Sequence, residues 1–445
     1  NGELESQFNL AEGRGFRLGF DPTKRRFLMS YGSSNIQLLP VLQALGVKDE
    51  DIQKTWGTEL YASALKSKKR GELVKLSKAL NPRAGAKTDS EAVPVIQEAL
   101  EKTKLLEDTT KITLGKGFSS VTGGALLASS EKLLNINKGD DKVDNRDALQ
   151  FKELWSINDH IPERIANSKR RITYKMANNL DRRDNVRAIV TSDIFNVPVK
   201  AFFTSTSLSQ QTTQVNPVDM VGGFLRTTIM GTGGIQNDSA ISDEAKLIDS
   251  SYLGFIDPVH TPEGKRSGIS GHLSLGVRKK GTTPRIRVFD VKAGKYNDKS
   301  PAELTLGNVS FSDQYDFSGK TPKPKNDTSV VIPVGGGDPS RVSSSDVDYV
   351  LQSPKQMFSI TANLVPFLPS DQANRAGMAT RHIEQAISLK DPEQPLVQVV
   401  SGNPDPNYAT WEKIVGRFTS HPSPVAGFVD SISSSRIVVK DKAGK

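Results

Sequence analysis

The sequence predicts a multidomain protein of the α+β class. The chain has 445 residues, enough for about two to four domains of ordinary size. Alternating apolar and polar residues predict strands, as at residues 14–31 and 285–289, whereas apolar residues at every fourth position predict amphipathic helices between them. No run approaches the ~20 apolar residues that a membrane-spanning helix needs, so no membrane partner is expected.

Charge and cysteine content narrow the possible functions. The formal net charge of +9 serves solubility, and it favours a polyanion partner over a cationic one. The chain has no cysteine, which excludes disulfides and thiolate metal sites and is compatible with a reducing compartment. Because residue 1 is Asn, we expect a trimmed or processed N-terminus.

The N-terminal third is predicted to be a small, mostly helical module without catalytic chemistry. Residues 14–31 should form a hairpin that turns at Asp21-Pro22-Thr23-Lys24. Helices are expected at 38–45, through Ile52, Trp56 and Leu60, at 73–80 and at 95–106. Residues 111–147 are polar and rich in turn residues, so loops are expected there.

Residues 163–187 are predicted to form one basic amphipathic helix. Its apolar stripe would contain Ile165, Ile172, Met176 and Leu180. The cations around that stripe are Arg164, Lys169, Arg170, Arg171, Lys175, Arg182, Arg183 and Arg187. A solvated basic face is the simpler interpretation, and direct contact with nucleic acid is the alternative.

The stretch 202–275 has the composition of a functional surface. Hydroxyls, amides, glycines and scattered cations dominate it, which suits a polar ligand better than a core. Beyond it, a strand at 285–289 precedes a segment of turns and flexible connections that includes the Lys/Pro-rich 320–325.

The last hundred residues are predicted to regain regular structure. A helix should begin at a Ser370/Asp371 cap and continue to about Ile387. Its buried side is expected to hold Ala376, Ala379, Ile383, Ala386 and Ile387. A last hairpin should join 425–428 to 436–439.

Several common catalytic patterns are missing from the sequence. The histidines show no His-x-x-x-His pairing, no Walker-type loop occurs, and no Asp-x-Asp-x-Asp cluster could hold the two magnesium ions of nucleotidyl transfer. The residues alone therefore predict a polar binding surface for an anionic ligand, without a self-contained active site and without a metal.

Three motifs resemble the β subunit of multisubunit DNA-directed RNA polymerases. The first resembles its fork region: Phe202-Phe203, Leu208-Ser209-Gln210, Gln214, Asn216-Pro217, Arg226 and Gly231-x-Gly233-Gly234. The second, Pro258-Val259-His260-Thr261-Pro262-Glu263-Gly264, is similar to the Thr-Pro-Glu-Gly signature that follows the fork. The third resembles the next signature helix: Ala362 to Leu368 with Asp371, Ala373-Asn374-Arg375-Ala376 and Met378. Order and approximate spacing agree as well.

The resemblance implies a domain organisation for the chain. It predicts a lobe-like module at 1–160, the return to the protrusion with the basic helix at 161–201, and the fork region at 202–275. A loop-rich external insert at 276–350 and a segment at 351–445, with the second signature helix and a C-terminal β hairpin, complete it. Because the second half of β is missing, the chain resembles the split β subunits of large-genome (jumbo) bacteriophages, which implies the infected bacterial cytoplasm or the virion.

The resemblance also implies a role for individual residues. The family's polymerases use Mg²⁺ held by an Asp cluster of the β′ subunit, so this chain should bind no metal, contribute no catalytic residue and be inactive alone. Gln210, Gln214, Asn216 and Arg226 would face the RNA–DNA hybrid, and the turn at Gly231, Gly233 and Gly234 would lie near downstream DNA. The candidates for phosphate contacts are Lys265, Arg266, Arg375, Arg381 and His382.

One departure from the family concerns the nucleoside triphosphate. The family's cation that contacts the triphosphate aligns with Glu384, so either Arg381, one turn earlier, or the other half of β is expected to supply that charge. The implied partners are the remaining half of β, β′-like subunits, a promoter-specificity subunit, template DNA, RNA and nucleoside triphosphates.

Two alternatives remain open at this point. The chain could be part of a related two-barrel polymerase that copies RNA. It could also be a non-catalytic DNA-binding or virion structural protein built on a degenerate β scaffold.

Overall fold

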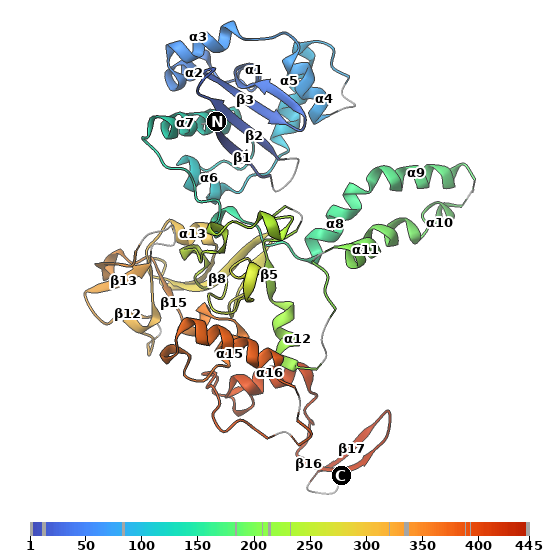
Figure 1. Ribbon diagram of the computed structural model, residues 1–445, viewed down its shortest axis with the longest axis vertical. Helices are drawn as coiled ribbons and strands as arrows, with labels where there is room; N and C mark the ends of the chain where they lie inside the picture. The colour runs from blue at the N-terminus through green and yellow to red at the C-terminus, as the bar shows by residue number, and fades with distance from the viewer. Residues whose placement is uncertain are drawn as a thin grey trace. The chain divides into compact units, whose positions relative to one another are not determined.

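The chain folds into two compact units, Asn1–Arg146 and Asp147–Lys445 (Figure 1). The computed structural model describes residues 3–10, 15–81, 85–182, 185–206, 208–211, 215–231, 233–319, 321–332, 338–387, 389–391 and 393–441. Both units combine helices with strands, which confirms the predicted multidomain α+β class. Within these ranges, no helix has both the length and the apolar composition to cross a bilayer.

An antiparallel sheet forms the centre of the first unit. Its strands follow one another in chain order: β1 (Leu4–Phe8), β2 (Phe16–Asp21), β3 (Arg26–Tyr31) and β4 (Ser34–Gln37). The predicted hairpin is confirmed, with Phe20 opposite Phe27 across its turn. Buried and less buried residues alternate along β2 and β3, as expected for a sheet with one face on a core.

Seven helices accompany this sheet in the described part of the unit. They are α1 (Leu38–Ala44), α2 (Asp49–Trp56), α3 (Thr58–Lys66), α4 (Glu72–Leu80), α5 (Asp89–Glu101), α6 (Glu107–Leu114) and α7 (Gly123–Lys138). The helices predicted at 38–45 and 73–80 are confirmed to within one residue. The helix predicted at 95–106 begins earlier, at Asp89, and ends at Glu101.

Two sequence predictions in this unit are wrong. Ile52, Trp56 and Leu60 do not share one helix, because Gly57 adopts φ +83° and separates α2 from α3. The loops expected at 111–147 include the 16-residue helix α7. The hydroxyl of Thr122 caps α7 by accepting a hydrogen bond from the N–H of Ala125 at 3.2 Å.

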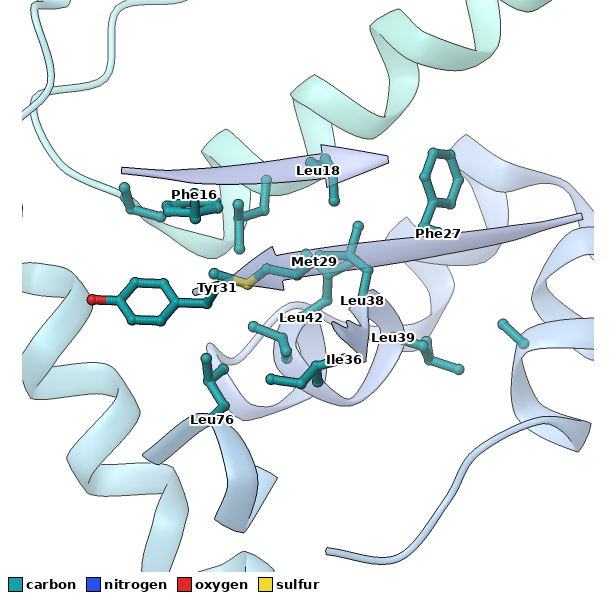
Figure 2. Close-up of a cluster of buried hydrophobic side chains, with 14 of the residues drawn as sticks. Phe16, Leu18, Phe27, Met29, Tyr31, Ile36, Leu38, Leu39, Leu42 and Leu76 are labelled. Atoms are coloured by element: carbon teal, nitrogen blue, oxygen red, sulfur yellow. The ribbon is translucent and has the colours of Figure 1, made fainter. Parts of the chain in front are cut away.

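The core of the first unit lies between the sheet and its helices (Figure 2). Leu18, Met29, Ile36, Leu38 and Leu42 are fully shielded from solvent. These residues come from three adjacent strands and from α1. The inward-facing side chains of the strands and the apolar side chains of the helix therefore pack into one cluster.

A group of four helices opens the second unit. They are α8 (Ile157–Asn167), α9 (Lys169–Leu180), α10 (Val186–Ile189) and α11 (Asp193–Ser205). Figure 1 shows α10 and α11 returning beside α8 and α9, and α11 packs against both of those helices. The single basic helix predicted over 163–187 is wrong, because Ser168 lies between α8 and α9 and α9 ends at Leu180.

A seven-stranded sheet occupies much of the region where the sequence predicts turns and flexible connections. The path β14-β13-β10-β15-β8-β7 runs across it, and β9 pairs with β8. The strands are β7 (Arg278–Lys280), β8 (Thr283–Asp290), β9 (Lys295–Lys299), β10 (Val309–Ser310), β13 (Thr328–Ile332), β14 (Ser340–Ser343) and β15 (Tyr349–Leu351). Beside it lie α13 (Pro301–Thr305) and the pair β11 (Tyr315–Asp316) and β12 (Lys323–Pro324).

The sheet was difficult to predict because most of its strands are short. Only β8, which contains the predicted strand at 285–289, is long enough to show clear alternation. The sheet nevertheless contributes to two apolar clusters, one around Ile286, Val288 and Leu351 and the other around Phe289 and Val350. This sheet therefore gives the second unit much of its core.

The remaining elements carry most of the sequence motifs. They are α12 (Pro217–Phe224), β5 (Arg226–Thr228), β6 (Ser270–His272), α14 (Ile360–Asn363), α15 (Ala373–Gln385), α16 (Trp411–Thr419), β16 (Gly427–Ile432) and β17 (Ile437–Asp441). Short 3-10 helices connect the elements of this unit: η1 (Leu149–Phe151), η2 (Asp238–Ala240), η3 (Glu244–Lys246), η4 (Ser250–Tyr252), η5 (Gly264–Arg266), η6 (Ser312–Gln314), η7 (Ser344–Asp346), η8 (Pro354–Met357), η9 (Leu368–Ser370) and η10 (Pro406–Tyr408).

The predicted second signature helix exists as α15, but its ends differ from the prediction. Its N-cap is Gln372, which makes no side-chain cap, so the predicted Ser370/Asp371 cap is wrong. Ala386 and Ile387 were expected on the buried side, whereas both lie beyond the helix and are exposed. Ala376 is buried as predicted. The last hairpin is confirmed as β16–β17.

Truncating one core side chain tests the first unit. Leu18→Ala is expected to lower the free energy of unfolding of this unit by about 2–5 kcal/mol, because it removes buried methyl groups and leaves a cavity. Hydrogen exchange of the β2 and β3 amides at increasing denaturant concentration, which reports on this unit alone, measures this loss. The matched control is Leu65→Ala at an exposed position, which should cost far less. Equal losses in the two variants would contradict the assigned core.

Candidate nucleic-acid interface

The strand pair β5–β6 brings the fork-like segment and the Thr-Pro-Glu-Gly segment together. The two strands are antiparallel, with Arg226 opposite His272 and Thr228 opposite Ser270. The Thr228 and Ser270 hydroxyls lie 2.9 Å apart, and the Ile229 N–H donates to the Ile269 carbonyl at 3.1 Å. Residues separated by forty or more positions in sequence are thus held side by side.

Three residues contact the guanidinium of Arg226, although its side chain remains partly exposed. Its Nη1 donates to the Oε1 of Gln210 at 3.0 Å, and its Nε donates to the Nε2 of His272 at 3.4 Å. Its Nη2 lies 3.7 Å from the carboxylate of Asp219 on α12. The side chain is 37% exposed. The guanidinium therefore has a defined position, and part of it remains accessible to a ligand.

His272 is stacked on His260 behind this arginine. The ring centroids are 3.5 Å apart and the rings are within 8° of parallel. The Nδ1 of His272 lies 3.2 Å from the carbonyl of His260. Since Nε2 accepts from Arg226, we assign the proton of the neutral ring to Nδ1. Burial, followed by the charge of His260, lowers the pKa of His272 to about 4, so this ring is neutral at pH 7.

Glu384 completes the group from helix α15. Its Oε1 lies 3.0 Å from the Nε2 of His260 and accepts a hydrogen bond from the Thr361 hydroxyl at 3.2 Å. Burial opposes ionisation of Glu384, but the contact with His260 outweighs burial and lowers the pKa of this carboxyl. The Nδ1 of His260 lies 2.9 Å from the Ser359 hydroxyl. We call Arg226, His272, His260 and Glu384 the four-residue bridge; it joins β5 to α15.

Part of this bridge has the residue types of a metal site, but its geometry does not suit one ion. The donor atoms of His260, His272 and Glu384 all lie within 4.8 Å of one another. A shared metal must lie near the plane of each imidazole and about 2 Å from its nitrogen. Two nearly parallel rings stacked at 3.5 Å cannot direct their lone pairs at one such point. That the chain binds no metal nevertheless stays a prediction.

The buried carboxylate of Asp257 holds two segments together, a role that the sequence did not predict. The carboxylate accepts hydrogen bonds from the N–H groups of Val259 at 2.8 Å, His260 at 3.1 Å and Ser359 at 2.6 Å. The Asp257-Pro258 pair is a turn signal that could have indicated such a carboxylate–backbone turn. The link to Ser359 joins two segments a hundred residues apart, which no local pattern indicates.

Asn216 fastens helix α12 to the end of α15. Its Oδ1 accepts from the Val218 N–H at 2.9 Å and so caps α12. Its Nδ2 donates to the carbonyls of Ile383 at 2.7 Å, Glu384 at 2.9 Å and Ala386 at 3.0 Å. The side chain is buried and both of its polar atoms are used within the chain. We assign Asn216 a structural role, and a contact with the hybrid stays an untested prediction.

The glycine turn after β5 has a clear backbone requirement. Gly231 and Gly233 adopt φ +105° and +86°, which L residues rarely adopt. A Cβ on Gly234 would lie 2.0 Å from the Ile229 carbonyl oxygen, so only glycine fits there. The Gly231 N–H donates to the Ile235 carbonyl at 2.8 Å and closes the turn. Proximity to downstream DNA remains a prediction.

The predicted phosphate contacts differ in their surroundings. Arg381 pairs with Glu263 of the Thr-Pro-Glu-Gly loop, a contact that lowers the pKa of Glu263. Arg266 binds Asp238 at 3.2 Å. Lys265 is exposed and has no acidic partner within the described ranges. His382 is exposed beside Arg381, whereas Arg375 lies about 9 Å nearer the N-terminus of α15 and contacts Met378.

The structure therefore brings some of the predicted site residues into contact with one another. Gln210 and Arg226 touch each other, and the four-residue bridge connects them to α15. Arg381 reaches the loop that carries Lys265 and Arg266. Gln214 lies outside the described residues. Glu384, which was expected to align with a triphosphate-contacting cation, is largely buried, and its carboxylate contacts His260 of the same chain.

Comparison with known proteins agrees with the motifs. Residues 210–278 match the family model for RNA polymerase Rpb2, domain 3, a range that includes β5, the glycine turn and β6. The chain is 29% identical over 339 residues to the DNA-directed RNA polymerase subunit beta of Phaeodactylum tricornutum, covering 75% of this chain and 24% of that protein. It is 28% identical over 341 residues to the same subunit of Spiroplasma citri, covering 73% and 25%.

These matches show which proteins the chain resembles. It is β-subunit-like, that is, similar to the β subunits of DNA-directed RNA polymerases. It spans about a quarter of the length of the curated relatives it matches. The similarity covers the fork-like strand pair directly, which places the four-residue bridge mostly inside the matched range.

Acid should weaken the second unit through His272. The pKa of this residue is about 4 when folded and ordinarily 6.5, so the unfolded chain binds more protons between these values. The contribution of His272 to the free energy of unfolding is therefore fully present above pH 6.5. It is lost as the pH drops towards 4, by up to about 3 kcal/mol. The depressed pKa of Glu384 acts in the same direction.

Chemical unfolding of the full chain at pH 4 to 7, with hydrogen exchange of the α12 and α15 amides as the readout for this unit, measures how its free energy of unfolding changes with pH. In His272→Gln the free energy of unfolding should change less steeply with pH between 6.5 and 4. The decrease corresponds to up to one proton taken up on unfolding, because the titrating ring is gone. His421→Gln, which removes an exposed imidazole elsewhere in the unit, is the control and should leave the slope unchanged. An unchanged slope in His272→Gln would exclude this residue as the source.

Proposed function

We propose that this chain is a part of the β subunit of a DNA-directed RNA polymerase and that it lines the cleft beside the RNA–DNA hybrid. The match of residues 210–278 to an RNA polymerase domain carries this proposal. Within that range, Gln210 and Arg226 are braced in one place and remain partly accessible. A moving hybrid must be held through its backbone, and amide and guanidinium groups suit such contacts without reading bases.

The proposal assigns bond formation to another subunit. Nucleotidyl transfer needs two metal ions, and Mg²⁺ prefers carboxylate oxygens and water. The four-residue bridge contains two imidazoles and a single carboxylate, which is not that ligand set. We therefore assign the Mg²⁺-binding Asp cluster to a β′-like subunit. This chain would be inactive alone and would position nucleic acid in the assembled enzyme.

The incoming nucleoside triphosphate is assigned to the loop beside α15. Glu384 cannot supply a cation, and its carboxylate is committed to His260. Arg381 lies on the same helix one turn before Glu384, and its partner Glu263, which fixes the orientation of its guanidinium, belongs to the loop that also carries Lys265. Charge-assisted hydrogen bonds from a pre-oriented guanidinium are among the strong contacts to phosphate. The other half of β remains the competing source of this charge.

The wider context of the enzyme is also a proposal. We infer partners in the remaining half of β, β′-like subunits and a promoter-specificity subunit, together with template DNA, RNA and nucleoside triphosphates. The resemblance to split subunits of large-genome bacteriophages suggests action in an infected bacterial cell or packaging in the virion. The rival functions are an RNA-templated polymerase and a non-catalytic DNA-binding or virion structural protein.

Isolation of the native complex separates these functions. Mass spectrometry is expected to find this chain with a partner that carries closely spaced aspartates, and the complex should extend RNA on a DNA template that competes with added RNA template. Preference for the RNA template would support the RNA-copying enzyme. A purified complex without such a partner and without synthesis would contradict the proposal and support a structural protein.

Replacing Arg381 tests the assignment of the triphosphate contact. In the assembled enzyme Arg381→Ala should raise the apparent KM for nucleotides by about tenfold or more, since a hydrogen bond from a charged group is lost. Steady-state RNA synthesis at varied nucleotide concentration provides the measurement. The control is Arg17→Ala, which removes an exposed, ion-paired arginine of the first unit. Unchanged kinetics in Arg381→Ala would remove this residue from the site.

A further inference from the structure

A hollow beside helix α16 is lined by polar and cationic residues. Its volume is about 320 Å³, at the small end of the ~300–1,000 Å³ that is typical of ligand sites. Its lining residues within the described chain are Asn407, Lys413, Gly416, Arg417 and Ser420, and we call this feature the α16 hollow. Two of these residues are cationic and none is acidic. The α16 hollow therefore has the charge of a site for a small anion.

The two cations are neighbours on one side of α16. Lys413 and Arg417 are four residues apart, and like charges at this spacing on a helix repel each other. Neither pairs with a carboxylate within the part of the chain that the structure describes. The acidic residues close in sequence have other contacts, because Asp405 accepts a hydrogen bond at the start of η10 and Glu412 accepts one from the Val399 N–H. An anion between the two cations would remove their repulsion.

Contacts with η10 hold both cationic groups in place. The guanidinium carbon of Arg417 lies 4.6 Å from the centroid of the Tyr408 ring, and its Nη1 donates to the Tyr408 hydroxyl at 3.4 Å. The Nζ of Lys413 donates to the Pro406 carbonyl at 3.1 Å. A guanidinium has five N–H donors and an ammonium has three, so these contacts orient the groups without using all of their donors.

Helix α16 is fixed on the segment that resembles the polymerase. Trp411 and Val415, on the side of the helix away from Lys413, pack in one apolar cluster with Val218 of α12 and Ile383 of α15. Figure 1 shows α16 close to both of these helices. Because α12 lies within the matched range 210–278, the α16 hollow belongs to the same packed region as the candidate interface.

We propose that the α16 hollow binds a phosphate group. Lys413 and Arg417 would supply charge-assisted hydrogen bonds, which are the strong contacts to phosphate oxygens, and the amide of Asn407 would add a neutral donor. In the assembled enzyme we assign this phosphate to the backbone of a nucleic-acid strand, and this assignment rests on the proposed function. A free phosphate ion is the other source of the same chemistry.

Two titrations of the full chain test the site and its source. Inorganic phosphate at constant ionic strength should bind at least tenfold more weakly to Lys413→Gln than to the unchanged chain. For a short single-stranded oligonucleotide without terminal phosphates, Lys413→Gln should lower the slope of log K against log salt concentration by about 0.7, the value for one phosphate contact. The control is Lys295→Gln, which removes the same charge from an exposed position on β9 and should change neither titration.

A second pair of variants separates charge from shape. A Cβ on Gly416 would have open space around it, so a longer side chain can be placed in the α16 hollow. Gly416→Glu adds a carboxylate beside the two cations, whereas Gly416→Gln adds a side chain of nearly the same size without charge. The Glu variant should bind inorganic phosphate at least tenfold more weakly than the Gln variant.

The outcomes distinguish this inference from the proposed function. Loss in both titrations supports a contact with the nucleic-acid backbone. Loss of phosphate binding with an unchanged oligonucleotide slope supports a free phosphate ion and overturns the assignment to nucleic acid. Equal phosphate binding by the unchanged chain, Lys413→Gln and Gly416→Glu, or no binding by the unchanged chain, overturns the site. An assembled enzyme that still synthesises RNA on a DNA template in that case leaves the proposed function intact.

Discussion

The stacking of His260 on His272 is the interaction on which the candidate site depends. The rings lie 3.5 Å apart between a cation, Arg226, and an anion, Glu384. Burial lowers the pKa of His272, and a neutral ring can both donate to a carbonyl and accept from a guanidinium. If this ring became charged, it would repel Arg226 and lose its acceptor. The position of the arginine at the surface is therefore coupled to the protonation of a buried imidazole.

Around that stack, the polar groups that face inward are engaged with the chain itself. Asp257 accepts three backbone hydrogen bonds, and Asn216 joins the start of α12 to the end of α15. Buried polar groups are costly when unpaired and make a site rigid when satisfied. The parts that stay accessible, Gln210, Lys265 and part of Arg226, are thus the groups able to meet a ligand without disturbing the frame. A surface along which a nucleic acid moves needs accessible polar groups that are supported by rigid, buried hydrogen bonds.

Much of the local structure followed from sequence patterns, whereas the contacts of the site did not. Alternation predicted the β2–β3 hairpin and β8, and spacing predicted α1, α4 and α15. Gly57 broke a helix that the spacing of Ile52, Trp56 and Leu60 had joined, and the short strands of the large sheet were missed because two to five residues show too little alternation. Motifs identified the segments of the site. The contact of Glu384 with His260 could not be predicted, because it joins residues 124 positions apart and depends on how α15 packs.

The proposed place of Gln210 and Arg226 beside the RNA–DNA hybrid can be tested with a photo-crosslinking amino acid at position 210 of the assembled polymerase, halted during elongation with labelled RNA and template. Crosslinks to RNA or template within the hybrid are expected, and none from the same probe at position 295, an exposed residue of β9. Equal labelling from both positions, or no label at position 210 in an active complex, would contradict it.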